Sequence, residues 1–473
     1  MALKQKKVGE PNRREILKYG LYGSLAPGLA SALWLSGCRA ERYKKRPWVL
    51  LVSVDTLRAD HLSCYGYHRN TSGAIDRFAE NALLFKNCLS HAPITGSSCA
   101  SILSGQLPHE VKVVGNNSPP NKPKMLAEIL RSVGYKTMAV VSNYVLRKGI
   151  GWEQGFKIYD ASFGDREQVR RTPERIAEHT TDRAVELLSK FQDEQVFMWV
   201  HYQDPHGPYT PPERFCRMFL DHGKTAVNLK LNKTSSGQGG IPRYQKLAGN
   251  TDLHYYISQY DGEIRYFDDH FNRLLEALKK MGKFERSLII FTSDHGEGMG
   301  EHDYYFAHGD NLYNILTHVP LIIKFGRELT GIRKDFVQHI DIVPTVLKIL
   351  GIETKYRFRG DDLRRESSTE REIFAEMISS TNKYETKTSI VLGGLKLIHT
   401  PVYKQYELFN LIDDPYEERN LIDDPKYRQR SDDLTARLNR IPKGRLLELR
   451  KGSKRRKITN EVKEKLKSLG YVQ

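Results

Sequence analysis

The chain has 473 residues and a formal net charge of +17 at pH 7, with 74 Lys and Arg residues against 57 Asp and Glu residues. It is 39% hydrophobic and its mean hydropathy is −0.55, which excludes a protein built mainly of membrane-spanning helices. The length is enough for one large domain and a smaller one. The positive charge favours an anionic partner such as an acidic polysaccharide or phospholipid headgroups. No zinc-finger, RNA-binding or helix-turn-helix signature indicates nucleic acid, and nothing in the sequence sets an oligomeric state.

The first 37 residues are typical of an export signal. Asn12-Arg13-Arg14-Glu15-Ile16-Leu17-Lys18 resembles a twin-arginine motif, and a weakly apolar stretch too short to span a bilayer follows it. Leu35-Ser36-Gly37-Cys38 is similar to a bacterial lipobox, in which Cys38 would carry the lipid. We therefore expect a signal peptide at 1–37, a tether at 38–46, export by the twin-arginine route, and a lipid anchor in the bacterial cell envelope or periplasm. A disordered basic tail with a chance cysteine is the alternative.

Four cysteines follow Cys38, namely Cys64, Cys88, Cys99 and Cys216. An oxidising compartment permits disulfides, but four cysteines allow three pairings and the spacing favours none of them. We expect buried free thiols.

From residue 47 onward, apolar runs alternate with helical patterns. The runs predict buried strands at Trp48–Val54, Lys136–Ser142, Val196–His201, Leu288–Ser293 and Val319–Lys324. Apolar residues at three- and four-residue spacing predict helices at Met125–Gly134, Thr181–Phe191 and Ile264–Met281. This alternation predicts an α/β fold with a mostly parallel, doubly wound sheet flanked by helices.

Two segments depart from the alternation. The polar stretch between Lys224 and Asn250 predicts a surface loop, which is a candidate lid over the site. After Gly351, short strand-like pieces such as Ile373–Met377 predict a smaller C-terminal α+β domain at 352–442. The large domain would then cover 47–351, and a basic helical tail would follow at 443–473.

Two of the predicted strands end in acidic residues. Asp55 follows the first apolar run, and Asp294 and His295 follow the run that ends at Ser293. Ligands of open α/β sheets bind at the carboxyl ends of the strands. Two carboxylates and an imidazole suit one divalent cation, which is Ca²⁺, Mg²⁺ or Mn²⁺, with Zn²⁺ as a further option. The sequence therefore predicts a metal site at this edge.

A candidate nucleophile lies between these two acidic positions. Thr95 follows Pro93 and begins a helix of small residues that Gly105 closes. Free backbone N–H groups at a helix start favour an anion, and a hydroxyl bound to the cation could attack phosphorus or sulfur. The alternative is a plain threonine N-cap, which the local sequence by itself favours.

Motifs spread along the chain resemble the sulfatase family of the alkaline phosphatase superfamily. They are Val52–Tyr67, His201–Tyr209, Tyr260–Ile264, Ser293–Glu297, Gly300–His302, Leu312–Tyr313, Val319–Ile322, Asp341–Thr345 and Leu469–Tyr471. Their order matches the family over nearly everything after residue 46. The resemblance implies an alkaline-phosphatase-like large domain with a smaller C-terminal domain, and a metal-dependent hydrolase of sulfate or phosphate esters.

The resemblance also assigns roles to residues. It implies that Asp55, Asp294 and His295 bind the metal and that Thr95 is both nucleophile and ligand. It places His206 near the leaving group and His308 against the transferred group. The family's second N-terminal aspartate falls on Thr56, so one expected ligand is missing. His201 and His302 are interpreted as packing or hydrogen-bonding residues.

The nucleophile region departs from the family pattern C-x-P-S-R, whose first residue is oxidised to formylglycine. The chain reads Thr95-Gly96-Ser97-Ser98-Cys99, so Ser97 replaces the proline and Cys99 the arginine. Threonine cannot become formylglycine, because oxidation of a secondary alcohol gives a ketone, so no formylglycine is expected. Lipoteichoic acid synthases and phosphoethanolamine transferases are family relatives with a threonine nucleophile. A second departure at Val141–Gly149 leaves open whether Arg147 or Lys148 joins the site.

Three functions remain open from the sequence. The first is cleavage or transfer of a phosphoester or phosphodiester through Thr95, on a glycan or lipid-linked substrate. The second is a true sulfatase that acts on sulfated glycans. The third is an inactive lipoprotein that binds an anionic glycan.

Overall fold

The computed structural model describes residues 46–113, 115–116, 124–167, 173–220, 225–327, 329–378 and 385–440. The predicted export signal, the predicted lipidation site Cys38 and the predicted tail at 443–473 lie outside these ranges. The chain from Pro47 onward forms one compact unit. Among the helices of the described ranges, none combines the length and the apolar character needed to cross a membrane.

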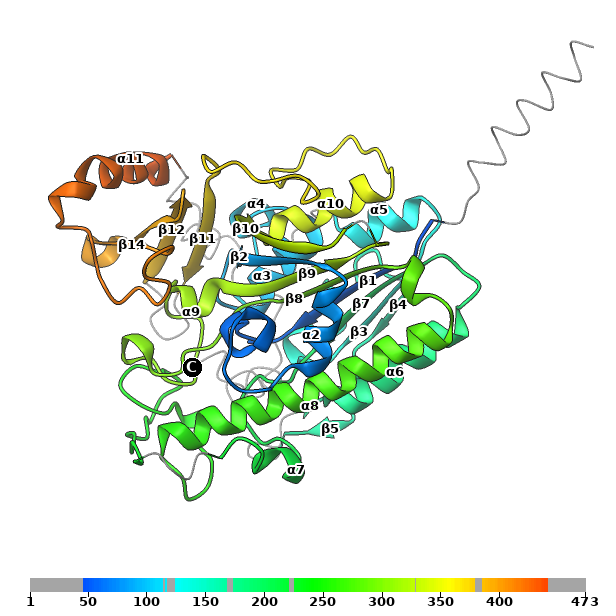
Figure 1. Ribbon diagram of the computed structural model, residues 1–473, viewed down its shortest axis with the longest axis horizontal. Coiled ribbons are helices and arrows are strands. Elements are labelled where there is room, and N and C mark those ends of the chain that lie inside the picture. Colours follow the sequence, from blue (N-terminus) through cyan, green and yellow to red (C-terminus); the bar gives the residue numbers. More distant parts are fainter. Residues whose placement is uncertain are drawn as a thin grey trace, which may run out of the picture. The chain divides into compact units, whose positions relative to one another are not determined.

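An eight-stranded sheet in the order β10-β2-β9-β8-β1-β7-β3-β4 forms the centre of this unit (Figure 1). Its strands are β1 (Val49–Val54), β2 (Leu83–Leu89), β3 (Lys136–Val141), β4 (Ile158–Asp160), β7 (Val196–Tyr202), β8 (Leu288–Ser293), β9 (His318–Lys324) and β10 (Gly331–Gln338). All neighbours pair in parallel except β9, which is antiparallel to β2 and β8. The predicted fold class and the five predicted strands are confirmed.

The direction of β9 follows from the segment before it. Residues 294–317 contain only short helical turns, among them α9 (Asn314–Thr317). The N–H of Gly296 donates to the carbonyl of Leu316 (2.9 Å), so this segment starts and ends at the same edge of the sheet. The chain therefore enters β9 from the edge at which β8 ended.

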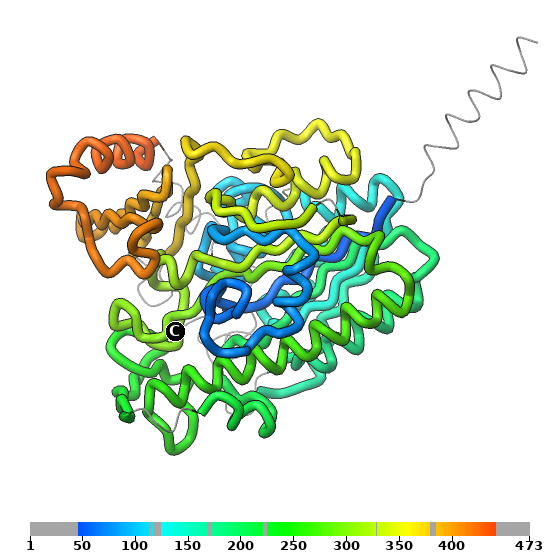
Figure 2. Tube along the Cα trace, in the orientation of Figure 1, coloured from blue at the N-terminus to red at the C-terminus, as the bar shows by residue number. Residues whose placement is uncertain are grey.

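Helices cover both faces of the sheet, as Figure 2 shows. One core lies under α2 (Gly73–Glu80), α6 (Ala177–Lys190) and α8 (Leu253–Lys280), and the short α7 (Glu213–Cys216) packs on α8. The other lies under α3 (Thr95–Ser104), α5 (Leu126–Ser132) and α10 (Ile342–Ile349), with α4 (Pro108–Val111) beside α3. In β1, Leu50 and Val52 face the first core and Val49 and Leu51 face the second, as strand alternation requires.

The helix predicted at Ile264–Met281 begins earlier than the apolar pattern indicated. Asp252 caps α8, and its side chain accepts a hydrogen bond from the N–H of Tyr255 (3.3 Å). The first turns carry buried tyrosines, Tyr256 and Tyr260, whose hydroxyls obscured the apolar periodicity.

The C-terminal part is a four-stranded antiparallel sheet with one helix against it. Its strands are β11 (Ile373–Ile378), β12 (Thr386–Leu392), β13 (Leu395–Thr400) and β14 (Gln405–Asn410), and its helix is α11 (Arg428–Asn439). A separate two-stranded ribbon joins β5 (Asp165–Arg166) and β6 (Pro173–Glu174). The predicted α+β character of the C-terminal domain is confirmed.

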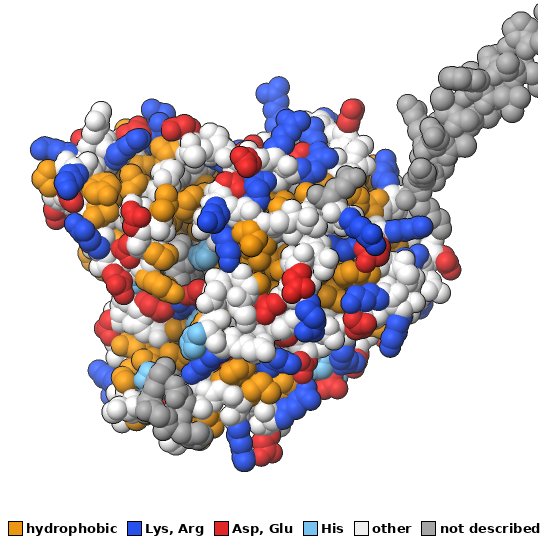
Figure 3. All heavy atoms as spheres, in the orientation of Figure 1, with side chains coloured by type: hydrophobic (Ala, Val, Ile, Leu, Met, Phe, Trp, Pro, Cys, Tyr) orange, Lys and Arg blue, Asp and Glu red, His pale blue; other side chains and the backbone are white. Residues whose placement is uncertain are grey.

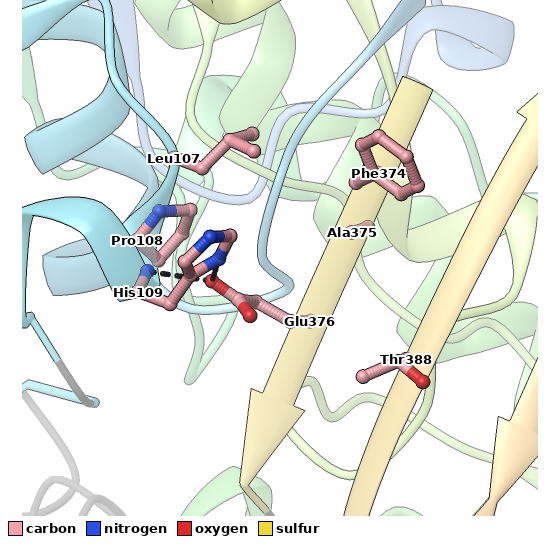
Figure 4. Close-up of a pocket in the computed structure, with 7 residues that line it drawn as sticks. All are labelled: Leu107, Pro108, His109, Phe374, Ala375, Glu376 and Thr388. Carbon is pink, nitrogen blue, oxygen red and sulfur yellow. Dashed lines mark hydrogen bonds and ion pairs between the residues drawn. The ribbon is translucent and has the colours of Figure 1, made fainter. Parts of the chain in front are cut away.

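One contact between α4 and β11 joins this sheet to the large domain. The backbone N–H of His109 donates to Oε1 of Glu376 (2.6 Å), and Nδ1 of His109 lies 2.9 Å from the same oxygen (Figure 4). The cavity beside this pair measures about 10 Å³, which is room for a single water molecule. It is therefore too small to hold an ester substrate.

The segment predicted as a candidate lid contains no α-helix in residues 225–250. Gln245 is fully buried and lies directly against Gly207, where a Cβ atom would come within about 2 Å of the Gln245 amide. Tyr244 donates a hydrogen bond from its hydroxyl to the carbonyl of Phe306 (3.0 Å). The segment therefore packs on the loop that carries His206, and its opening and closing stay a prediction.

On the one face of the molecule that Figure 3 draws, positive charge is distributed rather than concentrated. Lys and Arg side chains on this face are interspersed with Asp and Glu. A hollow of about 370 Å³ is lined by Arg77, Arg214, Arg265 and Arg273, but also by Asp268 and Asp269. Arg214 and Arg265 both pair with Asp269 (2.6 and 3.1 Å). This hollow is therefore a partly neutralised surface.

Candidate active site

Parallel register brings the two predicted aspartates together. Val54, the last residue of β1, pairs with Tyr202 of β7 on one side and with Ser293 of β8 on the other. The next residues leave the sheet at the same edge, and the N–H of Asp294 donates to the carbonyl of Val54 (3.1 Å). Asp55 and Asp294 are both fully buried.

Asp55, Asp294 and His295 form a compact group, called here the ligand cluster, whose donor atoms all lie within 4.8 Å of one another. Nε2 of His295 is 3.8 Å from Oδ1 of Asp55 and 3.7 Å from Oδ2 of Asp294. These two oxygens make no hydrogen bond to any described residue. Buried oxygens without partners that converge on an imidazole nitrogen fit a divalent cation.

The protonation of His295 also fits a metal ligand. Its Nδ1 lies 2.9 Å from the carbonyl oxygen of Gly296. A carbonyl only accepts, so Nδ1 carries the hydrogen and the Nε2 lone pair faces the carboxylates. Burial lowers the pKa of His295 to about 4, so the ring is neutral at pH 7.

The two carboxylates destabilise each other when no cation is bound. Burial, followed by the charge of Asp55, raises the pKa of Asp294 to about 6. Burial likewise raises the pKa of Asp55 well above its ordinary value, although the hydrogen bond from Asn143 opposes this effect. A bound cation would relieve this repulsion.

Thr95 lies beside the ligand cluster. Its hydroxyl oxygen is 3.5 Å from Nε2 of His295, and the residue is fully buried. The N-cap of α3 is Ile94, which makes no side-chain capping hydrogen bond, and Thr95 is the first residue of the helix, so the alternative of a plain threonine N-cap is wrong. The N–H of Gly96 donates to Oδ1 of Asn116 (2.7 Å), so this donor at the helix start is already occupied.

Sequence reasoning missed Asn143 and Ser98 among the residues that hold Asp55 and Asp294. Asn143 donates from Nδ2 to Oδ2 of Asp55, while its Oδ1 accepts from the N–H of Val145 (2.7 Å). Ser98 donates from its hydroxyl to the backbone carbonyl of Asp294 (2.6 Å). Asn143 follows β3, so the strand-end rule that found Asp55 could have found it as well.

Thr56 has a different part in the site from the aspartate that it replaces. Its φ of 56° is strained for a β-branched residue, and this conformation directs its N–H to Oδ1 of Asp294 (3.1 Å). Tyr260 holds the strained turn by donating to the carbonyl of Thr56 (2.7 Å). The Thr56 hydroxyl is buried and makes no hydrogen bond within the described chain.

Two further predicted residues border the cluster. The rings of His308 and His295 are 4.5 Å apart between centroids, and those of His308 and His206 are 5.3 Å apart. Nδ1 of His308 lies 2.9 Å from Oε1 of Glu297, whose Oε2 accepts from the Tyr209 hydroxyl (3.1 Å). Burial raises the pKa of Glu297 to about 8. Sequence reasoning did not assign a role to Glu297.

The comparison with known families gives a direct match. A family model described as Sulfatase matches residues 47–352, which is more than half of the chain. The chain belongs to the sulfatase family. A second model, described as N-sulphoglucosamine sulphohydrolase, C-terminal, matches residues 300–444. This sulfatase-family protein is therefore a hydrolase. Together, the two models cover both the large domain and the C-terminal sheet.

Individual relatives are distant. An N-acetylglucosamine-6-O-sulfatase of Bacteroides thetaiotaomicron is 23% identical over 87% of this chain and 89% of its own. A protein solved in complex with its substrate D-glucosamine-2-N,6-O-disulfate has a TM-score of 0.71 and 19% identity, over 87% of this chain and 100% of its own. A phosphonate monoester hydrolase from Silicibacter pomeroyi has a TM-score of 0.67 and 21% identity, over 84% and 95%. These two structures confirm the fold.

Of three further residues considered in the sequence analysis, Arg147 and His302 make their described contacts away from the ligand cluster, and His201 lies beside it. Arg147 lies over the ring of Tyr144 (5.0 Å) and donates to its carbonyl, so its described contacts are outside the ligand cluster. His302 stacks on Tyr313 with 3.7 Å between ring centroids, which agrees with a packing role. His201 is different, because its Nε2 lies 3.6 Å from Oδ2 of Asp55 in the buried site of this sulfatase-family protein.

Proposed function

We propose that this hydrolase cleaves or transfers a phosphate monoester or diester by way of Thr95. The observation that carries the proposal is the 3.5 Å distance between the Thr95 hydroxyl oxygen and Nε2 of His295, beside two buried carboxylates. Threonine gives no formylglycine, so the route that releases sulfate from an aldehyde hydrate is closed to it. Attack at phosphorus by a hydroxyl needs no such modification.

The residues of the site supply the steps. The ligand cluster and Thr95 would hold a divalent cation, which lowers the pKa of the hydroxyl and neutralises charge on the transferred group. Deprotonated Oγ1 of Thr95 attacks phosphorus, forms a bond to it, and displaces the leaving-group oxygen. His206 donates Nδ1–H to the carbonyl of Gly207 (2.8 Å), so Nε2 is the ring nitrogen that, in the imidazolium form, gives its proton to that oxygen. Water, or an acceptor hydroxyl in transfer, then releases Thr95.

Two alternative functions are a sulfatase that acts on glycans and an inactive glycan-binding protein. The distant relatives include an N-acetylglucosamine-6-O-sulfatase, which supports a sulfate ester on a glycan as substrate. A threonine sulfate would then have to lose its sulfate by attack at sulfur. An inactive glycan-binding protein is disfavoured, because a protein without chemistry has no need for two buried carboxylates that each have one oxygen without a hydrogen bond to described residues.

A substrate panel tests the proposal. The protein with Mn²⁺ or Ca²⁺ would be given p-nitrophenyl phosphate, bis-p-nitrophenyl phosphate and p-nitrophenyl sulfate. We expect phosphoester turnover to exceed sulfate turnover, and a phosphorylated Thr95 peptide to be trapped by acid quench and found by mass spectrometry. Dominant sulfate turnover that survives Thr95→Ala would refute the proposal, and so would the absence of any turnover.

From the sequence alone, we also propose where in the cell the protein acts. The motif at residues 12–18 and Cys38 support export by the twin-arginine route and a lipid anchor at the cell envelope. An anionic glycan or lipid-linked ester would be the substrate there. Labelled palmitate should enter the wild-type chain and not Cys38→Ala, and the wild type should fractionate with membranes. Labelling that persists in the variant would contradict the anchor.

A further inference from the structure

A second set of metal-binding side chains lies beside the ligand cluster and shares one residue with it. Sγ of Cys99, a ring nitrogen of His201 and a carboxylate oxygen of Asp294 lie within 4.8 Å of one another. All three residues are fully buried. We name Cys99, His201 and Asp294 the cysteine cluster, and we propose that it binds a second divalent cation of thiophilic character, namely Zn²⁺.

The backbone places Cys99 for this role. Cys99 lies four residues after Thr95 in α3, so both side chains are on the same side of the helix, one turn apart. His201 belongs to β7, whose neighbour β1 leads into Asp55. The cysteine cluster is therefore assembled from one helix and two strand ends, independently of His206 and His308.

Atoms without hydrogen bonds point to a missing ligand. Nε2 of His201 and Oδ2 of Asp294 are buried and make no hydrogen bond to any described residue. Nδ1 of His201 lies 2.8 Å from the Ser53 hydroxyl, and that hydroxyl accepts from Nε1 of Trp199 (2.8 Å). With a metal on Nε2, the ring would carry its hydrogen on Nδ1 and donate it to Ser53.

The chemistry of these donors selects the ion. Binding replaces the thiol proton, which leaves to solvent, by a sulfur–metal bond. Thiolate and imidazole suit Zn²⁺, whereas Ca²⁺ and Mg²⁺ prefer oxygen ligands.

The charge balance of the site supports a second cation. Asp294 belongs to the cysteine cluster, Oδ2 of Asp55 lies 3.6 Å from Nε2 of His201, and both carboxylates are fully buried. A cation at the cysteine cluster would offset part of that buried negative charge. This inference does not depend on which ester the protein cleaves.

Cobalt substitution tests the inference without substrate. The full chain would be freed of metal with a chelator, loaded with Co²⁺, and examined for the near-ultraviolet sulfur-to-cobalt charge-transfer band, and Zn²⁺ bound per chain would be counted by elemental mass spectrometry. We expect the band in the wild type and not in Cys99→Ala, and one more Zn²⁺ ion bound per chain in the wild type than in Cys99→Ala. Cys88→Ala is the matched control, because Cys88 is equally buried but lies in β2, and it should keep both properties.

Cys99→Ser provides a second variant that preserves the size of the side chain. It should also lose the band, even if Cys99→Ala folds poorly. A Zn²⁺ count that is the same in the saturated wild type and in Cys99→Ser would overturn the inference, and so would a cobalt band that persists in Cys99→Ser. Neither the cobalt band nor the Zn²⁺ count depends on turnover. A loss of phosphoester activity would therefore test the proposed role of Thr95 and not the cysteine cluster.

Discussion

The Thr95 hydroxyl lies 3.5 Å from Nε2 of His295, although the two residues are 200 positions apart in the chain. Thr95 begins α3 on one face of the sheet, and His295 follows β8 in its middle. Their proximity depends on the core under α3, where Cys99, Ile102 and Leu103 pack with the strands. The distance is short enough for one cation to contact both side chains.

Removal of the Thr95 hydroxyl should abolish activity with little change in folding. Thr95→Val keeps the shape of the side chain, and we expect kcat/KM for p-nitrophenyl phosphate to fall by about 10³-fold or more, as for the loss of a nucleophile. Thr95→Ser should retain measurable turnover. Ser101→Ala is the control, because Ser101 is buried in the same helix and its hydroxyl makes no hydrogen bond to described residues. Equal activity of Thr95→Val and wild type would contradict the assignment.

Asp294→Asn should stabilise the metal-free protein and prevent stabilisation by metal. The folded-state pKa of Asp294 is raised to about 6, so its stability contribution is complete below the unfolded pKa of about 3.9 and is lost as the pH rises through 6. At pH 8 with chelator, the free energy of unfolding of Asp294→Asn should therefore exceed that of the wild type by about 2–3 kcal/mol. Differential scanning calorimetry with chelator and with Mn²⁺ measures both effects. A lower Tm for the variant in chelator would argue against buried repulsion.

Asn143→Ala should weaken metal binding, because the Asn143 amide orients Asp55 so that Oδ1 of Asp55 faces His295. Loss of a residue that orients a ligand typically reduces affinity by about 10–100-fold. Isothermal titration with Mn²⁺ measures the change, and added metal should restore part of the activity. Asn87→Ala is the control, since the Asn87 amide bonds only to the carbonyl of Lys334 at the surface. An unchanged Mn²⁺ affinity in Asn143→Ala would show that Asn143 does not help to orient a metal ligand.

The pair of His109 and Glu376 should stabilise the protein more at low pH than at high pH. Burial lowers the pKa of His109, but the hydrogen bond and charge of Glu376 outweigh burial and raise it; Glu110 adds to the rise and Arg359 opposes it. The stability contribution is therefore complete below the unfolded pKa of about 6.5, and it is lost as the pH rises through the folded pKa.

Glu376→Gln should accordingly cost about 1.5–3 kcal/mol at pH 5.5, the usual range for a hydrogen bond to a charged group, and less at pH 9. Urea unfolding at the two pH values measures the difference. Glu213→Gln is the control, because the Glu213–Arg217 pair is exposed and should contribute nothing measurable. A cost that does not vary with pH would mean that His109 stays neutral.

The sequence determined five of the eight strands of the central sheet, the family and the ligand cluster. A strand buried on both faces is a local apolar run, and in a parallel sheet the residue after such a run always reaches the carboxyl edge. Asp55, Asp294 and His295 could therefore be predicted together from two separate segments. Thr95 was a prediction of the family pattern, since its local sequence favoured a plain cap.

Only the tertiary structure decided which other side chains surround the ligand cluster. The hydrogen bond from Asn143 to Asp55, the approach of Cys99 and His201, and the strained turn at Thr56 each join segments that no local pattern links. The physical reason is that burial and hydrogen bonding depend on which faces pack together. Apolar periodicity shows that a face is buried, but it does not show which polar atoms that face will meet.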